Sequence, residues 1–357
     1  MQIGWIQVVE FRSYRTLNWI PAARLNLLQG PNAQGKTNLL EALGMLVTGR
    51  SFRTSRMSEI PRWGAESSSL AGELCRGNEK PAARRTVRRT LTKIEDGSWQ
   101  NAGEAVEWAR AIAFGWQDLE IVNGAPGARR NFIDGFATRL YPTHLATLVR
   151  YRQVLARRNR LLQSGWQGEA GAAKLAPWNE QIAEVGMALI DRRRKAVAAL
   201  QTELARVYGA LSTPRGKIEV RYRTVLGEAS EPAALLAALE RARGAELRRG
   251  QTLVGPHRDD LAIEIDGTDA RAFGSRGQQR LVALALRLAE ILPVTEAAGT
   301  APILLLDDAL SELDPGVRAE VLRELGTAEQ VFLTTPEPLP VDGAAVFHVN
   351  GGGVAAA

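Results

Sequence analysis

Short apolar runs alternate with helical patterns near both ends of the chain. One run at 25–28 precedes a helical stretch at 38–47, and further runs occupy 303–306 and 331–334. A run of about four apolar residues is typical of a parallel strand that is buried on both faces. We therefore expect a mixed α/β lobe formed by residues 1–115 and 250–357. Its further strands lie at 67–75 and 84–94, and its final strand at 331–334.

The pattern between residues 116 and 250 is helical instead. Two seams of apolar side chains recur at helical spacing and are separated by a break at 164–177. A helix of about 34 residues spans only about 50 Å, so we expect a helical lobe with a short arm and not a long coiled coil. Apolar seams of this kind more often pack in the core of a protein than form an interface with a partner. The first consists of Tyr141, Leu145, Leu148, Leu155 and Leu162, and the second of Ile182, Val185, Leu189, Val197, Leu200, Leu204, Val207 and Leu211.

A glycine-rich turn lies between the first apolar run and its helix. GPNAQGKT at 30–37 satisfies the phosphate-binding pattern GxxxxGK[ST], in the strand-to-helix context that the pattern requires. Its glycines let successive amides point at phosphate oxygens, and the helix N-terminus favours negative charge. We expect Lys36 to reach the β and γ phosphates of a nucleotide and Thr37 to hold Mg²⁺. The predicted nucleotide-binding residues are Gly30, Pro31, Asn32, Ala33, Gln34, Gly35, Lys36 and Thr37.

Two carboxylates follow the apolar run at 303–306. A buried parallel strand would deliver Asp307 and Asp308 to its carboxyl edge, where ligands bind in sheets of this kind. We expect Asp307 to bind Mg²⁺ directly or through water. Asp308 is the candidate that orients or deprotonates the attacking water.

A second candidate anion site lies at SRGQQ, residues 275–279. Ser275 is a helix N-cap candidate, and Gly277 precedes an amphipathic stretch that begins at Gln278. Because the turn at 30–37 already supplies one anion site, a second one implies a second molecule.

SRGQQ and the run LLLDDALSELD at 304–314 together resemble the signature, Walker B and D-loop of the ABC ATPase class. The resemblance implies that Ser275, Gly277 and Gln278 of one subunit cover the nucleotide held by another. It assigns Ser311 and Asp314 to the D-loop. Closure would be two-fold and ATP-dependent, as in an isologous dimer.

Four segments together resemble the RecF recombination-mediator family across nearly the whole chain. They are IGWIQVVEFRSYRTLNW at 3–19, FGWQDLEIVNGAPGARRNFID at 114–134, TLVGPHRDDL at 252–261 and SRGQQRLVALALRLAE at 275–290. The resemblance implies an ABC-type ATPase head, which has the P-loop nucleoside triphosphate hydrolase fold. Its implied task is DNA repair at single-stranded gaps, with RecR and RecO as partners, RecA loading and support of the SOS response. The implied location is the cytoplasm, in association with the nucleoid.

Several positions depart from the wider class. Asp308 stands where many ABC ATPases have Glu, so we expect slow hydrolysis, and Thr334 stands where transporters place a switch His. Gln117 is a candidate lobe-linking glutamine near Mg²⁺, although Trp116 precedes it where the family more often has Pro. Two interpretations of His257 and its neighbour Arg258 stay open: they contact the nucleotide or dimer seam, or they belong to a turn stabilised by acidic neighbours.

Arginine is concentrated in the window 121–160. It holds eight arginines against one acid, Asp134, so its net charge is 8 − 1 = +7, against +6 for the chain. A basic helix stripe is expected where phosphates bind, but a solvated helix face in an arginine-rich protein explains the same pattern. The DNA candidates are Arg129, Arg130, Arg150, Arg152, Arg157 and Arg158. The preferred DNA form, whether single-stranded, duplex or a gapped junction, stays open.

Other features limit the alternatives. The only cysteine, Cys75, excludes an intramolecular disulfide framework, and no apolar segment is long enough to suggest a membrane span. The sole low-complexity stretch is the tail GGGVAAA. A transporter ATPase subunit, an SMC-like structural ATPase and a DNA-binding module without turnover are the competing interpretations.

Overall fold

The computed structural model describes residues 1–77, 83–164, 168–211, 216–326 and 328–357. The chain divides into two compact units. The first contains residues 1–119, the described part of 207–215, and 276–357; the second contains 120–206 and 216–275. The structure corrects the expected boundary at residue 250, because residues 250–275 group with the second unit. The signature segment at 275–279 is divided in the sequence: Ser275 ends the second unit, and Arg276 begins the last segment of the first.

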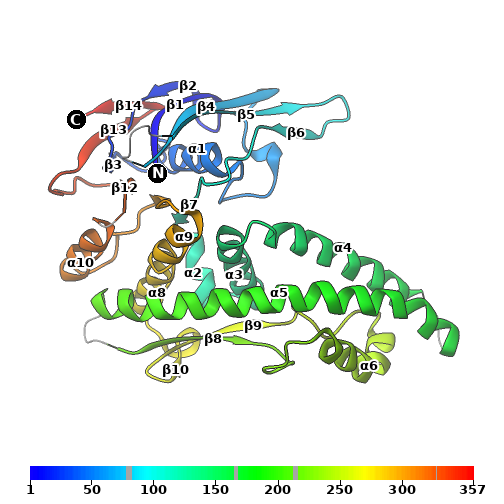
Figure 1. Cartoon of the computed structure of the whole chain (residues 1–357). Helices are drawn as coiled ribbons and strands as arrows, with labels where there is room; N and C mark the ends of the chain where they lie inside the picture. The colour runs from blue at the N-terminus through cyan, green and yellow to red at the C-terminus, as the bar shows by residue number, and fades with distance from the viewer. Residues whose placement is uncertain (78–82, 165–167, 212–215, 327) are drawn as a thin grey trace. The chain divides into compact units, whose positions relative to one another are not determined.

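A six-stranded sheet forms the centre of the first unit (Figure 1). Its order is β14-β13-β3-β12-β11-β7, and all pairs are parallel except β13 with β14. The expected strands at 25–28 and 303–306 are confirmed. The expectation that 331–334 is the final strand is wrong, since two strands follow it and the second uses the low-complexity tail. The strands are β3 (Leu25–Gln29), β7 (Ala111–Phe114), β11 (Ile303–Leu306), β12 (Val331–Thr335), β13 (Ala345–Asn350) and β14 (Gly353–Ala356).

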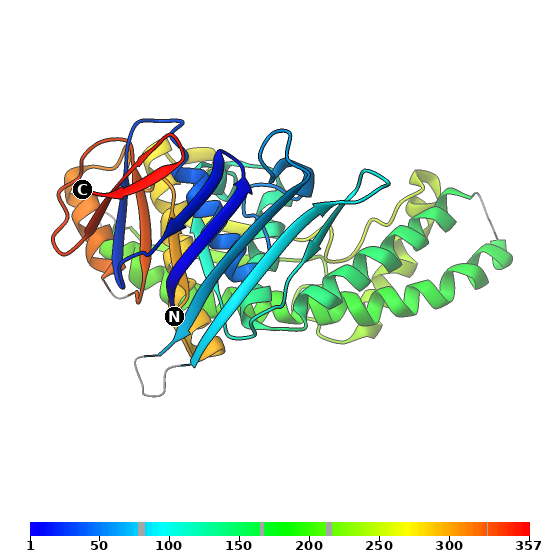
Figure 2. The ribbon, with the colours of Figure 1, turned by 90° about the horizontal axis from the view of Figure 1, so that it is seen from above.

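An antiparallel sheet of order β2-β1-β4-β5-β6 lies in the same unit and is seen from above in Figure 2. The strands expected at 67–75 and 84–94 are its third and fourth strands, β4 and β5. The bounds are β1 (Gln2–Phe11), β2 (Tyr14–Trp19), β4 (Ser67–Arg76), β5 (Ala83–Lys93) and β6 (Trp99–Ala102).

Helix α1 (Lys36–Thr48) packs between these two sheets. It contacts β1, β4 and β5 of the antiparallel sheet and β7, β11 and β12 of the parallel one. A helix that is covered on two sides must be apolar around most of its circumference. Accordingly, its residues from Leu39 to Val47 are all buried. This packing fixes the helix N-terminus at the carboxyl edge of the parallel sheet.

The remaining helices of the first unit are short. The signature stretch forms α8, and its residues from Arg280 to Leu286 are buried while its first four are not. The bounds are η1 (Met57–Glu59), η2 (Trp116–Asp118), α8 (Arg276–Leu288), α9 (Ile291–Ala298) and α10 (Pro315–Leu325).

The second unit is mainly helical, as expected, but it also contains a three-stranded sheet of order β10-β9-β8. Side chains of α4, α5 and α6 share one hydrophobic core, which includes Tyr151, Leu189 and Leu239. The elements are α2 (Leu119–Asn123), α3 (Pro126–Leu140), α4 (His144–Gln163), α5 (Gly168–Leu211), α6 (Pro232–Arg249), α7 (Ala270–Phe273), β8 (Ile218–Arg223), β9 (Asp260–Ile265) and β10 (Thr268–Asp269).

Helix α5 is longer than the expected 34 residues. It has 44 residues and contains Pro177, so the predicted break at 164–177 is too long. Residues 165–167 of that predicted break lie outside the described residues. Pro177 and Ala173 are exposed, so water can solvate the carbonyl that the proline leaves without a donor. The second apolar seam is entirely buried, which confirms that it is core. No helix in the described ranges combines the length and apolar character that crossing a bilayer needs.

Arg158 occupies the interior of the second unit. Its side chain is 1% exposed, and its guanidinium donates to Glu246 at 2.6 Å, to Thr252 Oγ1 at 2.8 Å and to Asn179 Oδ1 at 2.8 Å. The charge therefore joins α4 to α5, to α6 and to the segment that follows α6. A buried guanidinium with this many partners is structural.

We predict that Arg158→Ala destabilises the second unit by about 3–5 kcal/mol, because the substitution leaves the Glu246 carboxylate buried without its counter-charge. Thermal unfolding followed by circular dichroism measures the effect. Arg160→Ala is the matched control, since Arg160 is exposed on the same helix, and its melting temperature should stay close to that of the wild type. Equal melting temperatures for the two variants would contradict the structural role.

Candidate nucleotide site

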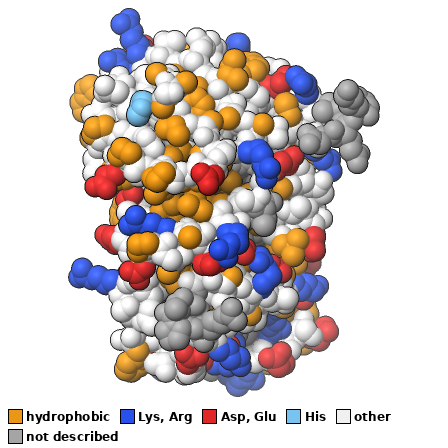
Figure 3. All heavy atoms as spheres, turned by 90° about the vertical axis from the view of Figure 1, so that its left-hand side faces the viewer, with side chains coloured by type: hydrophobic (Ala, Val, Ile, Leu, Met, Phe, Trp, Pro, Cys, Tyr) orange, Lys and Arg blue, Asp and Glu red, His pale blue; other side chains and the backbone are white. Residues whose placement is uncertain are grey.

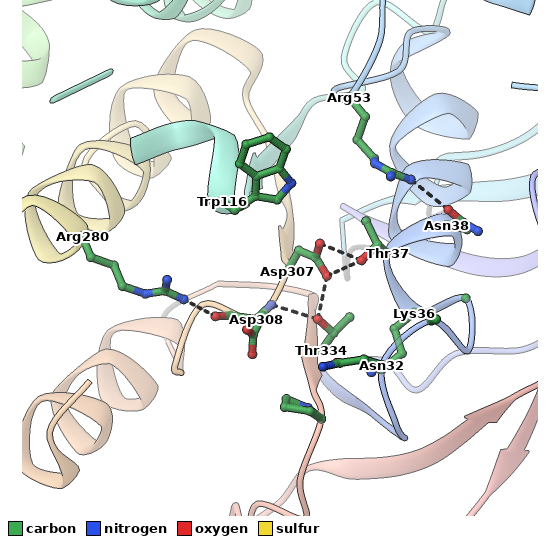
Figure 4. A pocket seen from close by; sticks show the side chains of 13 residues that line it. Asn32, Lys36, Thr37, Asn38, Arg53, Trp116, Arg280, Asp307, Asp308 and Thr334 are labelled. Atoms are coloured by element: carbon green, nitrogen blue, oxygen red, sulfur yellow. Dashed lines mark hydrogen bonds between the residues drawn. The ribbon is translucent and has the colours of Figure 1, made fainter. Parts of the chain in front are cut away.

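Four parallel strands, β3, β7, β11 and β12, end at one edge of the sheet, and a pocket of ≈ 360 Å³ opens there. All its lining residues belong to the first unit. Figure 4 shows the side chains that converge on it from the glycine-rich turn, β11, β12, η2 and α8. The lining residues are Asn32, Ala33, Gly35, Lys36, Thr37, Asn38, Arg53, Trp116, Arg280, Asp307, Asp308, Thr334 and Pro336.

The turn at 30–37 needs its glycines. Gly30 has φ +150°, and a Cβ there would lie 2.4 Å from the carbonyl oxygen of Val349. Gly35 has φ +107° and directly precedes α1, and Ala33 also adopts a left-handed φ of 64°. Left-handed residues among right-handed ones turn successive backbone N–H groups to one side, which forms an anion-binding concavity.

Lys36 lies at the base of this concavity. Its ammonium donates to the carbonyl oxygens of Gly30 and, at 2.8 Å, Pro31. Burial lowers the pKa of the Lys36 ammonium, while the carboxylates of Asp307 and Asp308 act in the opposite direction. Lys36, Asp307 and Asp308 line the same pocket.

Asp307 connects three segments that are distant in the sequence. Its carboxylate accepts from the hydroxyl of Thr37 at 2.8 and 2.9 Å and from the hydroxyl of Thr334 at 2.8 Å. A hydroxyl and a carboxylate on the phosphate-facing side are the ligands Mg²⁺ uses when nucleotide phosphates and water complete its octahedron. Within the described residues no group of three or more His, Cys, Asp or Glu could hold a metal ion by itself. The Thr37 hydroxyl and the Asp307 carboxylate therefore suit a metal ion that binds together with a nucleotide.

Asp308 is held in an unusual conformation. Its φ is +51°, a left-handed value that is unfavourable for residues other than glycine. Its amide donates to Thr334 Oγ1 at 2.9 Å, and its carbonyl oxygen accepts from Arg280. Its carboxylate accepts from Ser311 at 2.9 Å, so it turns away from Asp307 (Figure 4). Surrounding hydrogen bonds thus impose the strained backbone, as is common at functional sites.

Three charged or aromatic residues of the pocket were not expected. Arg53 donates to Asn38 Oδ1 at 2.8 Å and to the buried carboxylate of Glu41 at 3.1 Å, and Arg280 donates to Ser311 Oγ at 2.8 Å. Trp116 was noted only as a departure from the family. No sequence signal distinguishes Arg53 from its many arginine neighbours. Arg280 lies five residues after Ser275, and only the structure shows that it is buried in α8 and reaches the pocket.

The other expected site residues lie outside the pocket. Gln117 follows Trp116 in η2 but does not line the pocket within the described part of the chain. Ser275, Gly277 and Gln278 are exposed. Ser311 contacts Asp308, whereas Asp314 is exposed and precedes α10. The signature residues are therefore accessible to another molecule.

The structure contradicts two of the DNA candidates, Arg129 and Arg158, which are buried, and leaves Arg130 half-buried. Arg129 pairs with Asp260 at 2.7 Å and is buried, Arg130 donates to the Asp259 carbonyl at 2.9 Å, and Arg158 is internal. These side chains serve the fold, which charge counting along a helix cannot reveal. Arg150, Arg152 and Arg157 are exposed on α4.

The GPHRDD segment belongs to the second unit, where His257 and Arg258 form hydrogen bonds with Tyr151 and Thr252. His257 Nδ1 lies 2.6 Å from the Tyr151 hydroxyl, and Nε2 lies 3.0 Å from the Thr252 carbonyl oxygen. Burial lowers the pKa of His257 to about 4, so the imidazole is neutral near pH 7. Arg258 donates to the same carbonyl at 3.2 Å. Both side chains close the turn on itself.

Known proteins resemble the chain over its whole length. A family model described as the RecF/RecN/SMC N terminal domain matches residues 2–346. Two DNA replication and repair proteins RecF, from Heliobacterium modesticaldum and Desulforudis audaxviator, are 35% and 36% identical, over 99% of this chain and 98% and 99% of theirs. The solved structure of the recombination mediator protein RecF-ATP in the RecFOR pathway superposes with a TM-score of 0.88 at 29% identity, and covers 99% of this chain and 97% of its own.

These matches favour the RecF interpretation over a transporter subunit and over a long-armed structural ATPase. Because the family model spans nearly the whole chain and full-length relatives exceed 30% identity, the chain belongs to the RecF family of SMC-like, ABC-class ATPases.

Proposed function

We propose that the protein is an ATP-dependent DNA-binding protein of DNA replication and recombinational repair. ATP binding closes a homodimer on DNA, and slow hydrolysis reopens it. The observation that carries the proposal is the geometry of Asp307, whose carboxylate joins Thr37 of the phosphate loop to Thr334 of β12 beside Lys36. The RecF relatives support the biological task, since they are named for replication and repair.

Each pocket residue has a role in this proposal. The amides of the turn at 30–37 and the Lys36 ammonium bind the phosphates, and Thr37 and Asp307 hold Mg²⁺. Mg²⁺ neutralises charge that develops on the transferred phosphoryl group. Asp308 is the candidate that positions the attacking water. Gln117 remains a candidate lobe-linking residue near Mg²⁺ only if a rearrangement brings its side chain to the pocket.

Slow turnover follows from the state of Asp308. Its side chain is one methylene shorter than Glu, and it is engaged by Ser311. To hold a water near Asp307, the carboxylate has to leave Ser311 and turn. The hydrolytic arrangement therefore requires a change at the D-loop, which an approaching second subunit supplies in this proposal.

Gly277 supports a dimer in which the signature acts in trans. A Cβ at this position would meet nothing within 4 Å, and its φ is not in the left-handed region. Glycine in a helix is less favourable than alanine by up to about 1 kcal/mol. The fold of the chain itself thus gives no reason for glycine here. Close approach of a nucleotide held by a second copy gives such a reason, because glycine has no side chain to block it.

DNA contact rests on Arg150, Arg152 and Arg157 in this proposal. On the face that Figure 3 shows, Lys and Arg are interspersed with Asp and Glu instead of forming one basic field. Phosphate binding in this proposal depends on these three exposed arginines of α4. By family, the partners are RecR and RecO, with RecA loading at single-stranded gaps and support of the SOS response as the downstream result.

We predict that Mg²⁺-ATP converts the wild-type protein from monomer to dimer, and that Lys36→Met and Ser275→Arg abolish the change. Lys36→Met removes a phosphate contact, whereas Ser275→Arg blocks the signature without touching the phosphate loop. Asp308→Asn should prolong the dimer because it slows hydrolysis. Sedimentation velocity with ATP or ADP measures all four proteins. Wild-type protein that binds ATP and stays monomeric would refute action in trans.

We predict that Arg280→Ala lowers ATP turnover by about 10- to 100-fold, because the Asp308 backbone loses the donor that holds its strained conformation. The affinity for ATP should stay within about twofold, since Arg280 does not touch the phosphate loop. Steady-state hydrolysis and equilibrium ATP binding separate the two quantities. Arg323→Ala on exposed α10 is the control. Unchanged turnover in Arg280→Ala would exclude this coupling.

We predict that replacing Arg150, Arg152 and Arg157 together with Ala lowers the salt dependence of DNA binding by about two to three units of slope, because each phosphate contact contributes about 0.9. Fluorescence anisotropy with gapped DNA across a salt series gives the slope. The control carries Arg241, Arg248 and Arg249→Ala, which removes the same charge from exposed positions on α6. Equal slopes for the two triple variants would place the DNA elsewhere.

A further inference from the structure

Strand β5 of the antiparallel sheet extends well beyond the strand that pairs with its outer edge. On one side, β4 pairs with β5 from Ala83 to Thr92. On the other side, β6 pairs with β5 only from Thr90 to Lys93. Figure 2 shows β5 as the long cyan strand that continues past the short β6. Among the described residues, no strand therefore pairs with the outer edge of β5 at 83–89.

The backbone alternation shows which polar groups point to this free edge. The Lys93 amide donates to the carbonyl oxygen of Glu66, on the side of β4. In an antiparallel sheet the N–H and C=O groups of one residue point to one side, and those of the next residue point to the other. The backbone groups of Thr86 and Arg88 therefore point away from β4. A Cβ at Gly103, beyond the free edge, would lie 2.8 Å from the Arg88 carbonyl oxygen, which agrees with this direction.

A hollow of ≈ 420 Å³ lies along the free edge. Residues of β5 line one side of it, and the segment 102–106 lines the other. Two buried side chains, Val87 and Val106, contribute apolar surface to the lining, and Arg85 and Arg88 contribute charge. All the lining residues belong to the first unit. An extended chain segment thus has both a row of backbone partners and space beside them.

Arg89 holds β5 in place from its inner face. Its side chain is buried, and its guanidinium donates to the carbonyl oxygens of Leu46 and Val47 at 3.2 and 3.5 Å. These carbonyls end helix α1, where they lack partners within the helix and where a positive charge is favourable. The strand is therefore fixed to a helix that is itself buried. A binding edge that is already ordered loses little conformational entropy when a partner binds.

The free edge is basic. Arg84 and Arg85 form ion pairs with Glu73 and Glu104, both at 3.4 Å, and both arginine side chains are more than half exposed. Exposed pairs of this kind contribute only about 0–1 kcal/mol, so a partner's carboxylates can replace them. The exposed Arg88 makes no ion pair within the described part of the chain. The charge of this edge thus suits an acidic partner.

We propose that the free edge of β5 binds an extended acidic segment of a partner protein, which adds to the antiparallel sheet as a further strand beside residues 84–88. The backbone groups of Thr86 and Arg88 form hydrogen bonds with the backbone of this segment, and the arginines pair with its carboxylates. Main-chain hydrogen bonds give the affinity in strand addition, and side chains give the specificity. Here the specificity is for negative charge.

Other occupants fit the edge less well. A second copy of the chain would place the arginines of two β5 edges against each other, and like charges across paired strands are unfavourable. Charged residues on an edge strand are a common protection against such self-association. A nucleic acid shares the negative charge, but its phosphates are acceptors only. It would leave the outward carbonyl groups of β5 without donors.

The first experiment uses a fluorescent seven-residue peptide in which Asp or Glu alternates with Val, titrated with the full-length protein and followed by anisotropy. We expect saturable binding that weakens as salt is added, because exposed charges are screened. Methylation of alternate peptide nitrogens removes the donors on one side of the peptide and should weaken binding about tenfold or more. A peptide with Lys in place of the acids should not bind.

Two variants separate the backbone contribution from the charge. Thr86→Pro removes an amide that faces the free edge and leaves the pairing with β4 intact, since proline is tolerated at such edge positions. It should weaken peptide binding about tenfold. Arg88→Glu should weaken binding about fivefold at low salt and less at high salt. Arg241→Glu on exposed α6 is the charge control and should bind the peptide like the wild type. ATP binding should stay within about twofold in all three variants, because none of these residues lines the nucleotide pocket.

Hydrogen exchange of the wild-type protein gives an independent readout. The peptide should slow the exchange of the Thr86 and Arg88 amides more than that of the Val87 amide, which faces β4. Thr86→Pro that binds the peptide as tightly as the wild type would exclude strand addition. The absence of saturable binding up to about 1 mM peptide would overturn the proposal. Binding of single-stranded DNA that depends on Arg88, without peptide binding, would assign the edge to nucleic acid instead.

Discussion

The hydrogen bonds of the Asp307 carboxylate are the constraint on which the rest of the site depends. They join Thr37, 270 positions away, and Thr334, 27 positions away. Such distant segments meet because the parallel strands end at one edge of the sheet. The backbone amides and polar side chains that follow each strand therefore lie close together there. Packing α1 between two sheets fixes the position of Thr37 in this arrangement. A change in β3, β11 or β12 therefore shifts the Asp307 carboxylate or the hydroxyl groups of Thr37 and Thr334 that bind it.

The strain at Asp308 belongs to this arrangement too. Its backbone conformation is unfavourable by itself, so it persists because Thr334 and Arg280 hold it from two sides. Arg280 belongs to α8, whose first turn is the exposed signature. The exposed end of this helix is thus connected to Asp308, the acid beside Asp307, through one guanidinium. No long relay of side chains is needed.

Arginine has two distinct uses in this protein. Arg129, Arg158 and Arg193 are buried and paired with acids of the second unit, where they connect α3 to β9, α4 to α6 and α5 to α3. The planar guanidinium satisfies several acceptors at once, which makes an internal position tolerable. The high net charge of the window 121–160 is therefore divided between the interior and the surface. Only the exposed part is available to nucleic acid.

The sequence by itself determined the phosphate-binding turn, the strand that carries Asp307 and Asp308, and the class of fold, because these depend on local patterns of glycine, apolar runs and carboxylates. The contribution of residues 250–275 to the second unit, the last two strands and the interior position of Arg158 were decided by tertiary structure, since pairing between distant segments and burial leave no periodic signal. The same holds for Trp116 and Arg280. Trp116 begins the short helix η2 and Arg280 lies in the second turn of α8, and only the meeting of β7, β11 and α8 places both at the pocket.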